Sequence, residues 1–193
     1  MAELKDFIGV QRLMRYMTEY FRYSIRTGYE KVSLKKELAF LRTYCAIAAE
    51  RYPDCFVLET SVDDSCKQMK IPPLLLHTFV ENSIKHTVQV GVFITICVEV
   101  KRVGYQAIIT ITDDGEGVSA DTIEEIRARM KLDDLPNNER YGLWNCAKRL
   151  ELIYGDEATI EIQSQLSDGC CVTIRMPFEE KAEEGSKDEA SDL

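Results

Sequence analysis

The sequence predicts an α+β fold: helices on one face of a mixed, largely antiparallel sheet, preceded by a helical hairpin. Apolar residues recur at alternating steps of three and four over 3–26 and from Leu34 to Ala48, a spacing typical of amphipathic helices. Pairs of alternating segments in the middle and at the end of the chain indicate antiparallel hairpins. No glycine-rich turn links a strand to a parallel βαβ unit, which argues against a dinucleotide-binding arrangement.

The two N-terminal segments form the predicted hairpin. Ser33 is a candidate N-cap for the second helix, which we expect to continue until Pro53. Neither apolar stripe finds a large enough partner within a hairpin, so we expect self-association into a bundle, that is, a homodimer through these helices. The alternative is that both helices lie on the following domain. The stripe of the first helix contains Phe7, Val10, Met14, Met17 and Phe21.

Strands and helices are mixed in the part of the chain that follows the hairpin. We expect strands at 56–62, 92–100, 105–112, 158–165 and 170–176. We expect helices beginning at Ile71, after Ser119 and around Leu143, the last ending at Gly155. Pro72 and Pro73 suit the first turn of the Ile71 helix, because proline lacks an N–H that is unpaired there anyway. Residues 132–140 have the composition of a loop.

Composition limits the possible functions. The 193 residues carry a formal net charge of −9 with no basic cluster, which argues against a nucleic-acid partner. No run of eighteen apolar residues occurs and 1–20 are charged throughout, so we expect neither a membrane span nor a signal peptide. From Glu179 onward seven acids and two lysines predict a disordered tail. We therefore divide the chain into a hairpin (1–53), a following globular domain (54–178) and a tail (179–193).

Two segments carry candidate site residues. The helix from Ile71 has an apolar stripe that includes Phe79 and Ser83, and an opposite polar face with Asn82, Lys85 and His86. Such a face, taken alone, is more often solvated than functional. Thirty residues later, a strand runs directly into Asp113-Asp114-Gly115-Glu116-Gly117. A carboxylate at a strand end can accept a hydrogen bond from an amino group, while bare glycine backbone can lie against a flat ring.

Together, VENSIKHT and DDGEG resemble the N box and first glycine box of the ATP-binding fold shared by histidine kinases, gyrase, MutL and heat-shock chaperones. The segment LLLHTFVENSIKHT, together with FRYSIR, SLKKELAFLRTY and GCCVTIRMP, is similar to the LytS/YehU-type sensor histidine kinases in particular. This resemblance covers 10–178 and implies a two-layer α/β sandwich of Bergerat type that binds ATP and Mg²⁺.

The resemblance also implies residue roles. Asn82 would bind Mg²⁺, which accepts a carboxamide oxygen while keeping several waters. Lys85 and His86 lie one turn further on the same face and would point at phosphates, so these three form the expected catalytic set. Asp113 would accept the adenine amino group. The remaining expected nucleotide contacts are Gly115 and Gly117 beside the base, and Gly142, Leu143 and Asn145 at the end of the second glycine box, where helix-start N–H groups favour anions.

The chain departs from the family at four places. Asp114 stands where the family usually has asparagine, and we assign it no direct role. Arg140 stands where glycine is common, and would either neutralise phosphate charge or block the lid. His77 replaces a common glutamine and is expected to be a surface or half-buried structural residue beside Glu81. The family's N-P-H-F phosphoacceptor motif is absent. We therefore expect the catalytic part of a kinase that transfers the ATP γ-phosphoryl to a histidine outside this chain, for relay to a response regulator.

The upstream segments would then contain the membrane anchor, and this part would lie on the cytoplasmic side of a bacterial receptor. Two alternatives remain. One is a degenerate nucleotide-binding module used for interaction. The other is an ATP-hydrolysing relative of gyrase or MutL, which the residues disfavour because Thr78 stands where those enzymes carry a water-activating glutamate.

Overall fold

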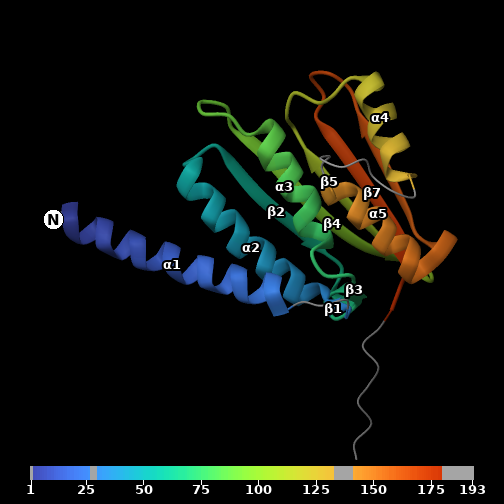
Figure 1. The fold of residues 1–193 in the computed structure, drawn as a ribbon, viewed down its shortest axis with the longest axis horizontal. Coiled ribbons are helices and arrows are strands. Elements are labelled where there is room, and N and C mark those ends of the chain that lie inside the picture. The colour runs from blue at the N-terminus through green and yellow to red at the C-terminus, as the bar shows by residue number, and fades with distance from the viewer. Residues whose placement is uncertain (1, 27–29, 133–140, 180–193) are drawn as a thin grey trace, which may run out of the picture.

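The computed structural model describes residues 2–26, 30–132 and 141–179 (Figure 1). The predicted helices and strands occur in the predicted order, and two short strands that were not predicted, β1 and β3, are added to them. Their bounds are α1 Ala2–Arg26, β1 Val32–Ser33, α2 Leu34–Arg51, β2 Phe56–Val62, β3 Lys70–Ile71, α3 Leu75–Thr87, β4 Ile94–Val103, β5 Gln106–Asp113, α4 Ala120–Met130, α5 Tyr141–Tyr154, β6 Thr159–Ser164 and β7 Cys170–Pro177, with short 3₁₀ turns at Asp64–Cys66 and Gly155–Glu157.

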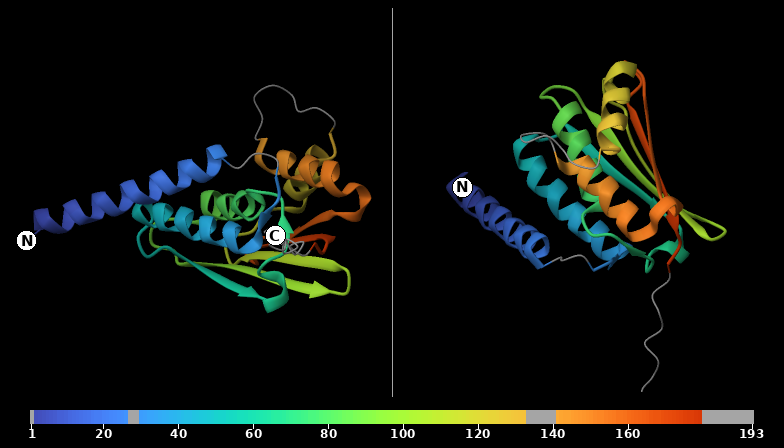
Figure 2. Two further views of the ribbon diagram at one scale, coloured as in Figure 1. Left: turned by 90° about the horizontal axis from the view of Figure 1, so that it is seen from below. Right: turned by 45° about the vertical axis from the view of Figure 1, so that its right-hand side comes forward.

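The main sheet has five strands in the order β2-β4-β5-β7-β6. Only β2 and β4 run parallel in it, and the other neighbouring pairs are antiparallel. Helices lie on one side of this sheet, as Figure 2 shows from two directions. Accordingly Ile109 and Ile111 of β5 are buried beneath the helices, whereas Thr110 and Thr112 on the opposite face are half-buried. The predicted α+β layering is confirmed.

Local signals located most element ends correctly. Ser33 caps α2, its hydroxyl accepting from the Lys36 amide, and Ser119 caps α4 by accepting from the Thr122 amide. The β4–β5 hairpin turns at Gly104 with φ 61°, a conformation that glycine adopts without a steric penalty. The cap at Ser33 was predicted, and the helix after Ser119 begins where it was expected. The predicted loop at 132–140 and the tail from residue 180 onward fall almost entirely outside the described residues.

The start of α3 differs from the prediction. Ile71 belongs to β3, where it pairs with Val32 of β1, and the helix begins only at Leu75. Pro72 and Pro73 therefore precede the first turn instead of forming it. The physical reason is that a residue before proline is pushed toward extended conformations, which keeps both Ile71 and Pro72 out of the helix.

The hairpin helices are packed differently from each other. Leu34, Leu38 and Leu41 of α2 belong to the same buried cluster as α3 and the sheet. Thus α2 lies on the following domain, which the alternative expected of both helices. In contrast, α1 packs along α2 and turns its own apolar stripe outward, with Phe7 and Met14 both 62% exposed. The division of the chain at residue 53 stays a prediction.

The C-terminal end of the described chain is tied back to the hairpin. The Glu179 carboxylate pairs with Lys31, and its carbonyl accepts from the Lys70 amide at 2.9 Å. Lys31 also lies over the Tyr154 ring, 4.4 Å from its centroid. Within the described part of the chain, no helix has the length and apolarity that a membrane crossing requires.

Candidate functional site

The two candidate motifs meet at the end of β5. The Ser83 hydroxyl, on α3, donates to Asp113 Oδ2 at 2.7 Å, although thirty residues separate them in sequence. The other carboxylate oxygen, Oδ1, accepts from the Gly115 amide at 3.3 Å. Asp113 is only 9% exposed, so these two donors hold a buried carboxylate in one orientation. Each oxygen keeps a lone pair that could accept from a further amino group.

Ser83 is a site residue that the sequence analysis missed, although it placed Ser83 on the correct face of the helix. Its helical angle puts it beside Phe79 on the inward face of α3, which was interpreted as core stripe. The structure shows a half-buried hydroxyl directed at a carboxylate. The available signal was a small polar residue within an otherwise apolar stripe, opposite a strand that ends in aspartate.

The glycines of the DDGEG turn have a packing reason that is visible in the structure. A Cβ at Gly115 would lie 1.4 Å from Thr87 Cγ2, so α3 and the turn can approach this closely only without a side chain. Gly117 has φ 65°, and a Cβ there would lie 2.1 Å from the Gln165 carbonyl oxygen. The turn is therefore shaped by its neighbours, and its contact with a base stays a prediction.

The second acid of the motif, Asp114, has a structural role. Its Oδ1 accepts from the Thr95 amide at 2.6 Å, and its own amide donates to the Thr95 carbonyl. These bonds continue the β4–β5 ladder by one residue beyond Asp113. No direct role was predicted for Asp114. The structure explains this residue by its hydrogen bonds to the Thr95 backbone.

The polar face of α3 lies beside the start of α5. Asn82 is half-buried, whereas Lys85 and His86 are exposed one turn later. A Cβ at Gly142 would lie 3.5 Å from Thr78 Cγ2, which brings the first turn of α5 against the same helix. The helix-start backbone predicted to favour anions thus adjoins the helix that carries the predicted metal ligand. On α5, Leu143 is half-buried and Asn145 is exposed.

Arg140 lies outside the described residues, so its predicted part in the site stays open. Within the described ranges, no group of three or more His, Cys, Asp or Glu side chains could hold a metal ion by itself. The half-buried carboxamide of Asn82 suits a metal bound through one protein ligand plus waters and substrate oxygens, which is how Mg²⁺ usually binds in phosphate sites.

His77 is more deeply buried than predicted. It is 6% exposed, and burial lowers its pKa to about 4. Its Nε2 lies 3.4 Å from the Tyr20 hydroxyl and its Nδ1 lies 3.7 Å from Glu81, as the helical angle indicated. The ring packs edge-on against Tyr44 at 4.6 Å. A buried, neutral imidazole among aromatic rings is a structural residue.

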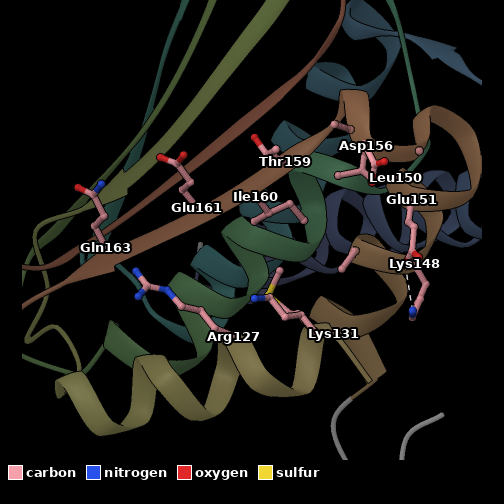
Figure 3. Close-up of a pocket in the computed structure, with 14 residues that line it drawn as sticks. Arg127, Lys131, Lys148, Leu150, Glu151, Asp156, Thr159, Ile160, Glu161 and Gln163 are labelled. Atoms are coloured by element: carbon pink, nitrogen blue, oxygen red, sulfur yellow. Dashed lines mark hydrogen bonds and ion pairs between the residues drawn. The ribbon is translucent and has the colours of Figure 1, made fainter. Parts of the chain in front are cut away.

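A cavity of about 640 Å³ lies between α4, α5 and β6, and contains none of the predicted site residues. Two of its lining cations are engaged: Arg127 donates to the Ile162 carbonyl, and Lys148 pairs with Glu151 at 3.0 Å. The cavity is thus separate from the Ser83–Asp113 junction. Figure 3 shows its lining residues, among them Arg127, Lys131, Lys148, Thr159 and Ile160.

Comparisons with known proteins agree with this geometry. The sequence is 26% identical over 184 residues to the sensor protein LytS of Bacillus subtilis, covering 92% of this chain and 30% of that protein. It is 29% identical over 183 residues to LytS of Staphylococcus epidermidis, covering 93% and 30% respectively. The chain therefore spans about a third of the length of these curated relatives.

Solved structures share the fold. The catalytic domain of the histidine kinase ThkA superposes with a TM-score of 0.58 at 14% identity, over 80% of this chain and 99% of that one. Full-length ShkA in complex with AMPPNP gives a TM-score of 0.60 at 15% identity, over 88% of this chain and 36% of that one. The α/β sandwich predicted from the resemblance is confirmed.

Two family models divide the chain between them. A histidine kinase model matches residues 1–56, which contain α1 and α2. The model of histidine kinase-, DNA gyrase B- and HSP90-like ATPases matches residues 73–180, which contain Asn82, the DDGEG turn and α5. Because this second match covers more than half of the chain, the chain belongs to the family of histidine kinase-, DNA gyrase B- and HSP90-like ATPases.

Proposed function

We propose that this chain is the ATP-binding catalytic portion of a LytS-like sensor histidine kinase. The observation that carries the proposal is the Ser83–Asp113 hydrogen bond, because it joins the helix of the predicted metal ligand to the predicted base-reading carboxylate. The names of the relatives, sensor proteins and sensor kinases, support the same activity. Binding of an adenine nucleotide is supported by the AMPPNP complex of a protein with this fold.

In this proposal each residue has one task. Asp113 accepts the adenine amino group, Asn82 binds Mg²⁺, and Lys85 and His86 face the phosphates. The first-turn amides of α5, which begins at Tyr141, add donors for the same phosphates. ATP supplies the phosphoryl group, and the protein positions it and neutralises its charge, which is the main contribution of proteins to phosphoryl transfer.

The acceptor histidine lies on a segment outside this chain in our proposal. His77 is 6% exposed among aromatic rings, where an in-line phosphate donor has no access. His86 sits on the same helix face as Asn82 and is assigned to phosphate binding. A phosphorylated acceptor would pass its group to a response regulator, the partner expected for sensor kinases.

Transfer is favoured over hydrolysis by the surroundings of Thr78. Its hydroxyl donates to the Leu74 carbonyl at 2.9 Å, so this position provides no base for a water molecule. Glu81, the nearest carboxylate in sequence to Asn82, is exposed and lies beside His77. We therefore expect little ATP turnover when no phosphate acceptor is present.

We also propose that α1 forms a homodimer through its outward apolar stripe. A single packed copy leaves this stripe in water, which is unfavourable for side chains of this size. The partner contributing the second stripe would be another copy of the same helix, as in a bundle. The stripe contains Phe7, Val10, Met14, Phe21 and Ile25, exposed by 62%, 57%, 62%, 53% and 81%.

The complete protein would place this part on the cytoplasmic side of the membrane.

Phosphoryl transfer tests the proposal. The chain is incubated with γ-³²P-labelled ATP, alone and with a longer chain that includes the preceding residues. We expect acid-labile label only on the longer chain, and loss of that label when its Asn82 is replaced by alanine. Label on His77 or His86 of the short chain would contradict the placement of the acceptor. Rapid release of phosphate without labelling would favour the hydrolase alternative.

A further inference from the structure

Glu37 is a buried carboxylate that no predicted role uses. It lies in the first turn of α2 and is 0% exposed. Among the described residues, no ion pair joins it to a cation. Burying a carboxylate without compensation is strongly unfavourable, so its hydrogen-bond partners have to be the reason for its position.

The partners of Glu37 come from two other helices. Its Oε2 accepts from the Leu74 amide at 3.1 Å, at the start of α3, and from the Tyr23 hydroxyl of α1 at 2.6 Å. Burial raises the Glu37 pKa, while the Tyr23 hydroxyl and the backbone amides of α3 lower it. Burial is the largest of these effects, so the pKa of Glu37 lies above its usual value. Its other oxygen, Oε1, is buried without a hydrogen-bond partner among the described residues.

Glu37 supplies a side-chain hydrogen-bond acceptor at the start of α3, where the N-cap residue provides none. Leu74 occupies the N-cap position without a side-chain capping bond, and it has φ 61°, in the left-handed region that leucine rarely adopts. Such a conformation persists only where its surroundings hold it. On its other side, the Pro73 carbonyl accepts from Arg149 of α5. The Pro73–Leu74 junction is thus held between α2 and α5.

The junction is mechanically linked to the nucleotide site. From Leu75 to Thr87, α3 is one uninterrupted helix that carries both Asn82 and Ser83. At 1.5 Å per residue, Ser83 lies roughly 12 Å from the first residue of this helix. A shift of the first turn moves the whole helix, and with it the hydroxyl that orients Asp113.

We infer that Glu37 is a positioning residue for the nucleotide site, and that the Tyr23 hydroxyl makes the placement of α1 part of that positioning. Movement of α1 that withdraws this hydroxyl would loosen the Leu74 junction and weaken nucleotide binding. The inference rests on the proposed function for its nucleotide readout, but its effect on the first turn of α3 does not depend on it.

Tyr23→Phe is the decisive variant. The ring stacks on Phe40 with centroids 4.1 Å apart, so phenylalanine keeps the packing and removes only the hydroxyl. Tyr44→Phe is the matched control, because Tyr44 packs against His77 in the same aromatic cluster while its hydroxyl makes no hydrogen bond with a described residue. Glu37→Gln completes a double-mutant cycle with Tyr23→Phe.

Two readouts are combined: Mg-ATP affinity by calorimetry, and amide hydrogen exchange of residues 74–78. We expect Tyr23→Phe to weaken affinity about fivefold and to accelerate exchange at the first turn of α3, with Tyr44→Phe unchanged in both. In the Glu37→Gln background, Tyr23→Phe should add little, because Tyr23 acts through Glu37.

Other outcomes are equally informative. A lower melting temperature with unchanged affinity and exchange would make Tyr23 merely structural and overturn the inference, as would additive effects in the cycle. If the wild type binds no nucleotide, the proposed function fails, while exchange at residues 74–78 still decides the inference. If Glu37→Gln does not fold, the comparison of Tyr23→Phe with Tyr44→Phe decides it.

Discussion

Replacing Ser83 by alanine isolates the contact that joins the two motifs. The substitution removes the Ser83 hydroxyl. Asp113, which is 9% exposed, then keeps the Gly115 amide, at 3.3 Å, as its donor among the described residues. A hydrogen bond to a charged group contributes about 1.5 to 3 kcal/mol. Alanine recovers a few tenths of a kcal/mol through its higher helix propensity. We therefore expect a net loss of about 1.5 to 2.5 kcal/mol in the free energy of unfolding.

Urea unfolding measures this loss directly, as a lower midpoint with an unchanged m-value. For a chain of this size the melting temperature should fall by about 3 to 10 °C. Ser24→Ala is the matched control, because the Ser24 hydroxyl donates to the Tyr20 carbonyl within its own helix and hydrogen-bonds no described residue of the site. A Ser83→Ala variant as stable as Ser24→Ala would show that the 2.7 Å contact contributes nothing, and would refute the reasoning.

Three further predictions concern the metal ligand, the buried histidine and the exposed helix. Asn82→Ala should weaken ATP binding by roughly tenfold when Mg²⁺ is present and far less in EDTA, because Asn82 acts through the metal; equal losses in both calorimetric titrations would reject that role. His77, with its pKa lowered to about 4 from 6.5, stays neutral in the folded state while the unfolded chain takes up a proton. Stability should therefore fall by about 2 kcal/mol between pH 7 and pH 5 because of this residue. His77→Gln should remove that part of the pH dependence in urea titrations, and an unchanged pH profile would show that His77 is protonated in the folded protein. Met14→Glu should dissociate the proposed dimer in sedimentation, whereas Arg22→Glu, on the polar side of α1, should not; two monomeric variants, or a monomeric wild type, would contradict the dimer interface.

Much of the fold could be predicted because it depends on periodic burial. The strands at 56–62 and 105–112 alternate in sequence and alternate in exposure in the structure. Caps such as Ser33 and Ser119 act on amides three residues away, so a short window of sequence is enough to locate them.

The errors arose where distant segments decide the local structure. Ile71 was placed in a helix, but its partner in the β1–β3 ladder is Val32, which periodicity near Ile71 does not indicate. Ser83 was assigned to the core face correctly by angle, but angle does not say that the core face meets a carboxylate. An acid in the first turn of a helix is usually a surface residue, so the sequence does not indicate that α1 and α3 cover Glu37.

The most direct test of the central claim is the nucleotide preference of Asp113→Asn. The claim is that the Asp113 carboxylate, held by Ser83 and the Gly115 amide, selects adenine by accepting its amino group. The affinities of wild type and variant for Mg-ATP and Mg-GTP are measured by calorimetry on the same preparations. We predict that the wild type prefers ATP and that Asp113→Asn loses most of this preference while remaining folded. An ATP-over-GTP ratio that Asp113→Asn leaves unchanged would contradict the account.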